Sequence, residues 1–169
     1  KVLCCLVLTV FISPATAKVF RYPESSKPSS LMPFFIENMS AVRVSEFLFE
    51  SLVTKNKRGD IEGVLAHSWS ASPDGLSITF QLKPNVKWHD GKAFSAQDVV
   101  FTVNAAQDRG TIFGLKGKYR FIRSAQAIGN LQVRFTLKKA YKKPEEQFTF
   151  KVIPKHHFQS TAITRLDRF

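Results

Sequence analysis

Hydrophobic and polar residues alternate along two segments of the chain, 76–82 and 131–137. This two-residue period predicts antiparallel strands with one buried face. Residues 122–128 are a further strand candidate, and the two-residue turn Gly129-Asn130 predicts a hairpin between this segment and 131–137. The apolar positions of the two alternating segments are Leu76, Ile78, Phe80 and Leu82, and Leu131, Val133, Phe135 and Leu137.

Two other segments carry apolar residues at helical spacing. Ser95 is followed three residues later by Asp98 and then by valines, which predicts a capped helix from about Ser95 to Asp108. Ser40 is expected to cap an earlier helix. The apolar face expected for that earlier helix consists of Ala41, Val44, Phe47, Leu48 and Leu52.

Asp-Gly dipeptides predict sharp turns at residues 72–75 and 89–91. Consecutive side chains of an extended run point to opposite faces, so the neighbours His89 and Asp90 do not make a catalytic pair, and Ser95 is interpreted as a helix cap. With strand candidates also at 18–22 and 64–69, the chain is predicted to be α+β: an antiparallel sheet with flanking helices.

The N-terminal segment is typical of a secretory signal. Lys1 precedes an apolar run of about a dozen residues, which is too short to span a membrane, and small residues follow at Ala15 and Ala17. We predict a signal peptide over residues 1–17 with cleavage after Ala17. Both cysteines, Cys4 and Cys5, lie within it, so the mature chain is expected to contain no disulfide and no thiol nucleophile.

The chain of 169 residues has a net charge of +12 and a hydrophobic content of 44 %, enough for a packed core. The charge raises nucleic acid or a membrane surface as a partner. Its basic residues are scattered, however, and no zinc-finger, RNP or glycine-rich motif accompanies them. A basic nucleic-acid-binding α+β domain is therefore an alternative, and we expect no nucleic-acid partner.

A metal site built from His89, Asp90, His156 and His157 is a second alternative. The two neighbouring histidines lack the spacing that places ligands on one face of a helix. The sequence therefore predicts no metal ligands, and it indicates no cofactor.

The order of several motifs resembles a known family. These motifs are "FESL" at 49–52, "LAHSW" at 65–69, residues 72–83, residues 86–102, "VRFTLKKAY" at 133–141, "IPKHH" at 153–157 and "SLMPF" at 30–34. Together they resemble the extracellular family 5 solute-binding proteins of peptide and nickel ABC transporters. The chain departs from the family pattern at Ser51, Gly63 and Met32, where the family has glycine, proline and the aspartate of "LDP".

The resemblance implies the N-terminal part of a two-lobed periplasmic binding protein type II-like fold. Residues 18–63 would form a strand, a ligand-side loop and a helix, 64–140 a sheet-and-helix subdomain, and 141–169 the start of the return to the main lobe. Because the family's members are much longer, the resemblance implies an incomplete fragment. A non-functional truncated product is the alternative.

The function implied by the resemblance is a periplasmic receptor, not an enzyme. Such a receptor traps a peptide or other small solute and delivers it to an inner-membrane ABC permease. In the family, the ligand-facing segment comes just after the "LDP" motif. In this chain that segment aligns with Ile36–Met39. We expect Glu37, Asn38 and Met39 to bind the ligand, although a solvated loop is an equal alternative. Phe113 is expected to be an apolar wall of the pocket or a core residue of its loop.

Overall fold

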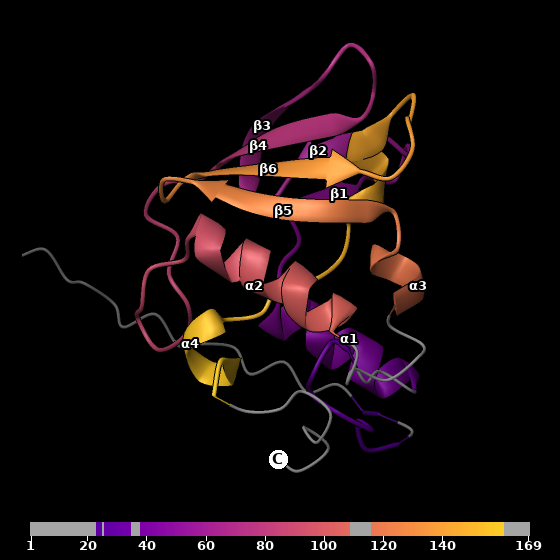
Figure 1. Ribbon diagram of the computed structural model, residues 1–169. Helices are drawn as coiled ribbons and strands as arrows, with labels where there is room; N and C mark the ends of the chain where they lie inside the picture. The colour runs from indigo at the N-terminus through magenta and orange to yellow at the C-terminus, as the bar shows by residue number, and fades with distance from the viewer. Residues whose placement is uncertain (1–22, 25, 35–37, 109–115, 161–169) are drawn as a thin grey trace, which may run out of the picture.

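The computed structural model describes residues 23–24, 26–34, 38–108 and 116–160. A four-stranded antiparallel sheet forms one layer, and helices α1 (Met39–Leu48), α2 (Ala96–Gln107) and α4 (Lys155–Phe158) lie on one side of it (Figure 1). The strands lie in the order β3-β4-β6-β5. Their bounds are Ala66–Ala71 for β3, Ser77–Leu82 for β4, Ile122–Ile128 for β5 and Gln132–Leu137 for β6. The predicted α+β class, with an antiparallel sheet and flanking helices, is confirmed.

The alternating pattern places one face of the sheet in the core. Ile78 pairs with Phe135 and Phe80 with Val133, and all four side chains are buried. Leu76 and Leu131 do not follow the prediction, because both lie outside the strands and are exposed. The hairpin turn is one residue longer than predicted: Ile128 pairs with Gln132, so Leu131 belongs to the turn.

Helix α2 (Ala96–Gln107) lies against β5 and β6 and begins where the sequence predicted (Figure 1). Ser95 is its N-cap residue, and the Asp98 carboxylate accepts a hydrogen bond from the Ser95 backbone N–H at 2.9 Å. This contact satisfies an amide that has no partner within the helix.

Helix α1 (Met39–Leu48) differs from its prediction in both its cap and its buried face. The N-cap is Asn38, whose side chain accepts a hydrogen bond from the Ala41 N–H, so the cap predicted at Ser40 is wrong. Phe47 is 85 % exposed, and the helix is buried through Ser40, Ala41 and Ser45. Of the other members of the predicted face, Val44 and Leu48 are half-buried, and Leu52 lies beyond the helix end and is buried in the core. The small side chains of Ser40, Ala41 and Ser45 let this face of α1 pack closely against the rest of the chain. The ring of Phe47 therefore lies on the solvent side of the helix.

Five short elements were not predicted, because a single turn or a three-residue strand leaves no periodic signal. They are β1 (Val53–Lys55), β2 (Ile61–Gly63), α3 (Lys116–Tyr119), the 3₁₀ helix η1 (Pro144–Gln147) and α4 (Lys155–Phe158). β1 and β2 form an antiparallel hairpin of their own. The predicted signal peptide and the strand predicted at 18–22 lie outside the described residues.

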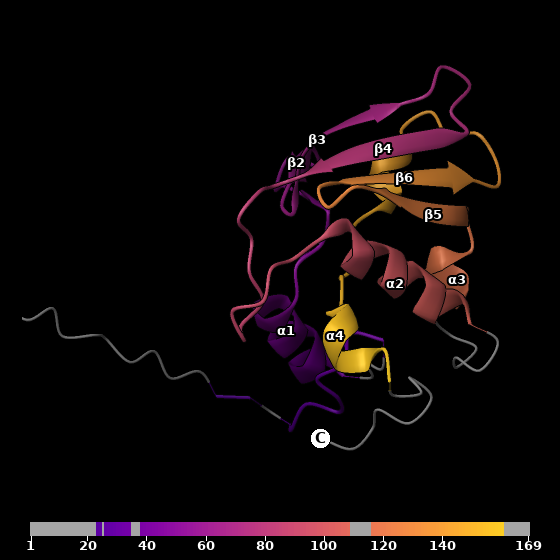
Figure 2. The ribbon, with the colours of Figure 1, turned by 60° about the vertical axis from the view of Figure 1, so that its left-hand side comes forward.

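Aromatic rings fill the core beneath the sheet. The ring of Phe148 lies 4.5 Å from that of Phe135 and 4.9 Å from that of Phe80, measured between centroids. The segment that carries Phe148 continues past Glu50, whose carbonyl accepts the Val152 N–H at 2.9 Å. This return path brings α4 next to α2, on the side of α2 away from the sheet (Figure 2).

No helix within the described ranges combines the length and apolarity that a membrane crossing would require.

Candidate functional site

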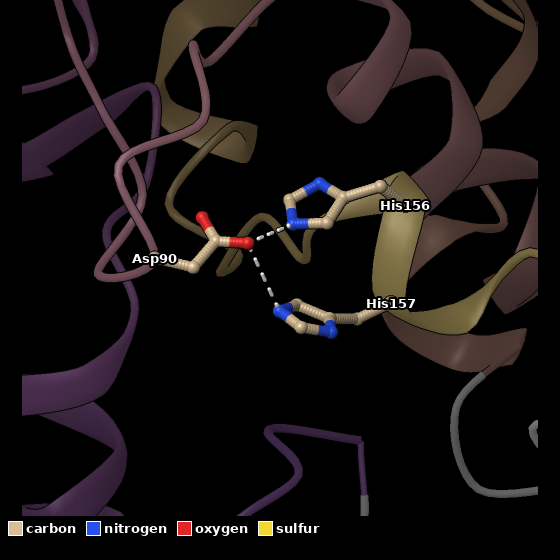
Figure 3. A group of neighbouring side chains, drawn as sticks. All are labelled: Asp90, His156 and His157. Atoms are coloured by element: carbon tan, nitrogen blue, oxygen red, sulfur yellow. Dashed lines mark hydrogen bonds and ion pairs between the residues drawn. The ribbon is translucent and has the colours of Figure 1, made fainter.

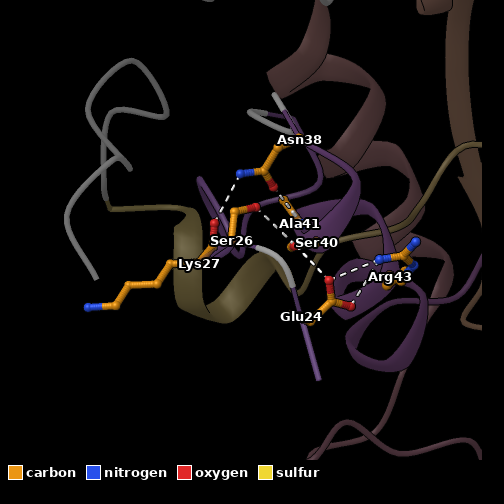
Figure 4. Close-up of polar contacts among 7 residues, drawn as sticks. All are labelled: Glu24, Ser26, Lys27, Asn38, Ser40, Ala41 and Arg43. Carbon is orange, nitrogen blue, oxygen red and sulfur yellow. Dashed lines mark hydrogen bonds and ion pairs between the residues drawn. The ribbon is translucent and has the colours of Figure 1, made fainter. Parts of the chain in front are cut away.

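Asn38, one of the predicted ligand-binding residues, makes two hydrogen bonds through its side chain. Its Oδ1 accepts the Ala41 N–H at 2.8 Å, and its Nδ2 donates to the Lys27 carbonyl at 3.0 Å (Figure 4). Both ends of the amide are thus used in structural contacts. Met39, the next residue, is 61 % exposed. Glu37 and Phe113 lie outside the described residues, so the ligand-binding role of the four residues stays a prediction.

A polar network attaches Glu24 and Ser26 to the first turns of α1 (Figure 4). The Ser40 hydroxyl donates to Glu24 Oε2 at 2.7 Å and lies 3.2 Å from the Ser26 hydroxyl. Arg43 donates to both oxygens of Glu24, at 2.9 and 3.2 Å. The position predicted as the helix cap, Ser40, therefore links the helix to the preceding chain.

The His89-Asp90-Gly91 segment is a turn, as the sequence predicted. The Gly91 N–H donates to the Trp88 carbonyl at 2.9 Å, and Gly91 has a φ of +84°, which glycine adopts without steric cost. Within the described contacts, no hydrogen bond joins His89, Asp90 and Ser95; the Ser95 hydroxyl donates to Asp98 instead. The turn therefore gives no nucleophile activated by a base.

The turn does bring Asp90 to two histidines from the far end of the chain (Figure 3). Asp90 Oδ2 lies 2.7 Å from His156 Nε2 and 3.4 Å from His157 Nε2. The pKa of the Asp90 carboxyl is lowered, mainly by the hydrogen bond from the Lys92 backbone N–H. Partial desolvation opposes this lowering of the pKa, and the contact with His156 adds to it. An ionised carboxylate thus faces two imidazole nitrogens.

This group contains three of the four residues considered for a metal site from the sequence. Sequence spacing could not show the convergence of Asp90, His156 and His157, because Asp90 lies 66 residues before His156. The fourth residue, His89, is not part of the group. It lines a different feature, a surface pocket.

This surface pocket, of about 210 Å³, lies beside the same turn. Its walls include Phe47, Leu65, Val86, Trp88, His89 and Phe94. The Trp88 Nε1 atom is buried and has no hydrogen-bond partner among the described residues. Glu50 and Lys87 also line the pocket, so its surface is partly apolar and partly polar. Sequence reasoning did not identify it because its walls come from separate segments.

Comparisons with known proteins connect this arrangement to one group of proteins. The family model for bacterial extracellular solute-binding proteins, family 5 Middle, matches residues 60–167. The glutathione-binding protein GsiB of Pectobacterium atrosepticum is 31 % identical over 110 residues, which are 65 % of this chain and 21 % of GsiB. The periplasmic murein peptide-binding protein MppA of Escherichia coli is 35 % identical over 104 residues, 60 % of this chain and 19 % of MppA.

The fold shows the same relationship. The crystal structure of NikZ from Campylobacter jejuni in complex with Ni(L-His) matches with a TM-score of 0.72 at 25 % sequence identity. The match covers 82 % of this chain and 28 % of NikZ. The chain thus spans about a fifth of the length of the curated relatives it matches, 21 % of GsiB and 19 % of MppA.

Proposed function

The chain belongs to the bacterial extracellular solute-binding proteins of family 5, and from this membership we propose that it is the substrate-binding component of an ABC importer for peptides or related small solutes. The observation that carries the proposal is the family match, which runs through residues 60–167 and so includes the sheet, α2 and α4. Relatives named for binding glutathione and murein peptides support peptides as the solute class.

The proposed mechanism is capture by closure, without chemical turnover. A solute that contacts two lobes stabilises the closed state, and an inner-membrane permease recognises that state. The residues described here would form part of one wall of the cleft. The contacts of Asp90 and Ser95 support a non-enzymatic role, because Asp90 accepts the Lys92 N–H and the Ser95 hydroxyl donates to Asp98, so the two do not form a nucleophile-base pair.

Within this proposal the ligand lies near the N-terminus of α1. Met39 is exposed there and would contact an apolar part of the solute, whereas Asn38 would hold the segment in place through its two backbone contacts. Glu37 would pair with a cationic group of the solute, and Phe113 would add an apolar wall. An extended peptide can hydrogen-bond to exposed backbone in such a segment.

The proposed location is the periplasm, reached through a signal peptide at residues 1–17. A fusion of the first 40 residues to alkaline phosphatase tests this, because that enzyme becomes active only after export. Activity that is lost when the apolar run is interrupted by two arginines would support the location. Equal activity with and without the arginines would refute it.

Binding is tested by isothermal titration calorimetry with tri-alanine, glutathione and a longer peptide. We expect a saturable heat with at least one probe. Met39→Ala should weaken the binding of that probe about tenfold, because the variant loses the free energy of burying part of the Met39 side chain against the solute. The control, Leu131→Ala, changes another exposed apolar residue, in the β5–β6 turn, and should bind as the unaltered protein does. No heat with any probe would contradict the function. Equal binding by the Met39 variant would contradict only the position of the site.

A further inference from the structure

We propose that Asp90, His156 and His157 form a binding site for a divalent transition-metal ion of the Zn²⁺ type. One carboxylate oxygen and two imidazole nitrogens would supply three ligands, and water would supply the fourth. The three ligand atoms lie within 4.8 Å of one another, and both imidazoles point their Nε2 atoms at the same oxygen (Figure 3). The site is separate from the solute contacts proposed near Met39 and does not depend on them.

One of the ligand distances already fits a tetrahedral ion. Zinc bonds to nitrogen and oxygen are about 2.0–2.2 Å long, so two ligand atoms on a tetrahedral ion are about 3.3 Å apart. Asp90 Oδ2 and His157 Nε2 are already 3.4 Å apart. The 2.7 Å hydrogen bond between Asp90 Oδ2 and His156 Nε2 would have to lengthen by about 0.6 Å. These side chains are partly exposed and would rotate to reach this separation.

The carboxylate is oriented before any ion binds. Asp90 Oδ1 accepts the Lys92 backbone N–H at 3.1 Å, which leaves Oδ2 directed at the two histidines. The turn itself is closed by the hydrogen bond from Trp88 N–H to the Lys92 carbonyl at 2.8 Å. Such contacts behind a ligand fix its direction and raise metal affinity.

The histidines are held from the other side. The Lys155 backbone N–H, at the start of α4, donates to Asp98 Oδ1 at 2.8 Å, which attaches this short helix to α2. The His157 N–H donates to the Pro154 carbonyl at 3.2 Å. Although neighbours on a helix point about 100° apart, the anchored turn and the long imidazole side chains let both Nε2 atoms reach Asp90.

The chemistry of the ligands selects the class of ion. Imidazole nitrogens suit Zn²⁺, Ni²⁺ and Cu²⁺, whereas Mg²⁺ and Ca²⁺ prefer oxygen ligands alone. The Lys92 ammonium lies 3.9 Å from Asp90 Oδ2 and is a competing cation. Its side chain is largely exposed, so it can move into solvent when a dication replaces it.

The test is calorimetric titration of the untagged protein with ZnCl₂ at neutral pH. We expect one Zn²⁺ per chain and no heat with MgCl₂. His157→Gln removes one ligand and keeps the hydrogen bond between Asp90 and His156, so it should weaken zinc binding by more than about tenfold. His67→Gln replaces an exposed histidine on β3 that is outside the group, and this control should leave the affinity unchanged.

A second measurement identifies the ligand atoms. Long-range proton–nitrogen NMR spectra report each histidine ring, and zinc should shift the Nε2 signals of His156 and His157 but not those of His67. The proposal is overturned if the unaltered protein takes up no zinc, if His157→Gln binds zinc as tightly as the unaltered protein, or if the shifts occur at other histidines. Equal thermal unfolding of the variants without metal would establish that His157→Gln keeps the fold.

Discussion

The hydroxyl of Thr102 on α2 accepts a hydrogen bond from the Ile153 backbone N–H at 3.0 Å, across 51 residues of sequence. Thr102 also donates to the Asp98 carbonyl at 2.8 Å, and both Thr102 and Ile153 are fully buried. One side chain therefore supplies the partner that the chain needs as it passes beneath α2 toward α4.

Replacing Thr102 with valine tests this contact. Valine keeps the shape but leaves the buried Ile153 N–H without an acceptor, which should lower the free energy of unfolding by about 1–3 kcal/mol. The measurement is urea denaturation followed by circular dichroism. Thr54→Val, on the exposed face of β1, is the matched control and should change stability by less than about 0.5 kcal/mol. Equal stability of the two variants would contradict the proposed role of Thr102.

Asp98 joins the start of α2 to the start of α4. One oxygen accepts the Ser95 N–H at 2.9 Å and the other accepts the Lys155 N–H at 2.8 Å. Asp98→Ala should lower the free energy of unfolding by about 2–3 kcal/mol, because it removes a cap and leaves a second amide unpaired.

Asp60→Ala is the control for the Asp98 variant. It removes an exposed ion pair with Arg58, a kind of contact that contributes about 1 kcal/mol or less. The same urea titration compares the two variants. A larger loss in the Asp60 variant would show that the buried carboxylate does not anchor the two helices.

Phe148 is at the centre of the aromatic core, and a second phenylalanine on the surface provides its control. Phe148→Ala should cost about 3–5 kcal/mol, because the ring is fully buried against Phe80 and Phe135 and its loss leaves a cavity. Phe47→Ala removes a ring that is almost entirely in solvent and should be nearly neutral. Thermal and urea unfolding of both variants would measure the difference, and similar losses would be inconsistent with this core.

The carboxyl of Asp74, in the turn at residues 72–75, should make the stability of the protein depend on pH. The Ser72 hydroxyl and then the Leu76 N–H, both donating to Asp74, lower the pKa of its carboxyl below the usual 3.8. A carboxyl whose pKa is lower in the folded than in the unfolded state stabilises the fold at pH values above its unfolded-state pKa. This contribution is lost as the pH falls through the folded-state pKa.

Asp74→Asn imitates the protonated carboxyl and so measures this contribution. The variant should be less stable than the unaltered protein at neutral pH, and the two should converge as the pH falls below about 3.8. Urea denaturation across this range gives the difference at each pH. A constant difference at every pH would show that ionisation of Asp74 is not its source.

Local patterns predicted much of this fold because each carries its cause within a few residues. The two-residue period of 76–82 follows from the geometry of a strand with one buried face, and Ser95 and Asp98 are close enough to cap α2 by themselves. The Asp-Gly turns likewise form from short-range contacts. In such segments the nearest neighbours along the chain favour the same structure as the finished core does.

The first helix shows where local reasoning was insufficient. Phe47 fits the apolar period, yet the surface available to α1 accepts the small residues Ala41 and Ser45. Which face of a helix is buried depends on the shape of what it packs against, and that shape is built from distant segments. The same reason hid the pocket beside Trp88, whose walls come from separate parts of the chain.

By itself, the sequence determined the class of the fold, the positions of its main strands and of α2, and the resemblance to solute-binding proteins. These depend on short-range periodicity, on turn chemistry and on the order of motifs. Only the tertiary structure decided that Asp90 faces His156 and His157 and that Thr102 receives the Ile153 amide. Such contacts join residues more than 50 positions apart, so their geometry exists only after the sheet and its helices have packed.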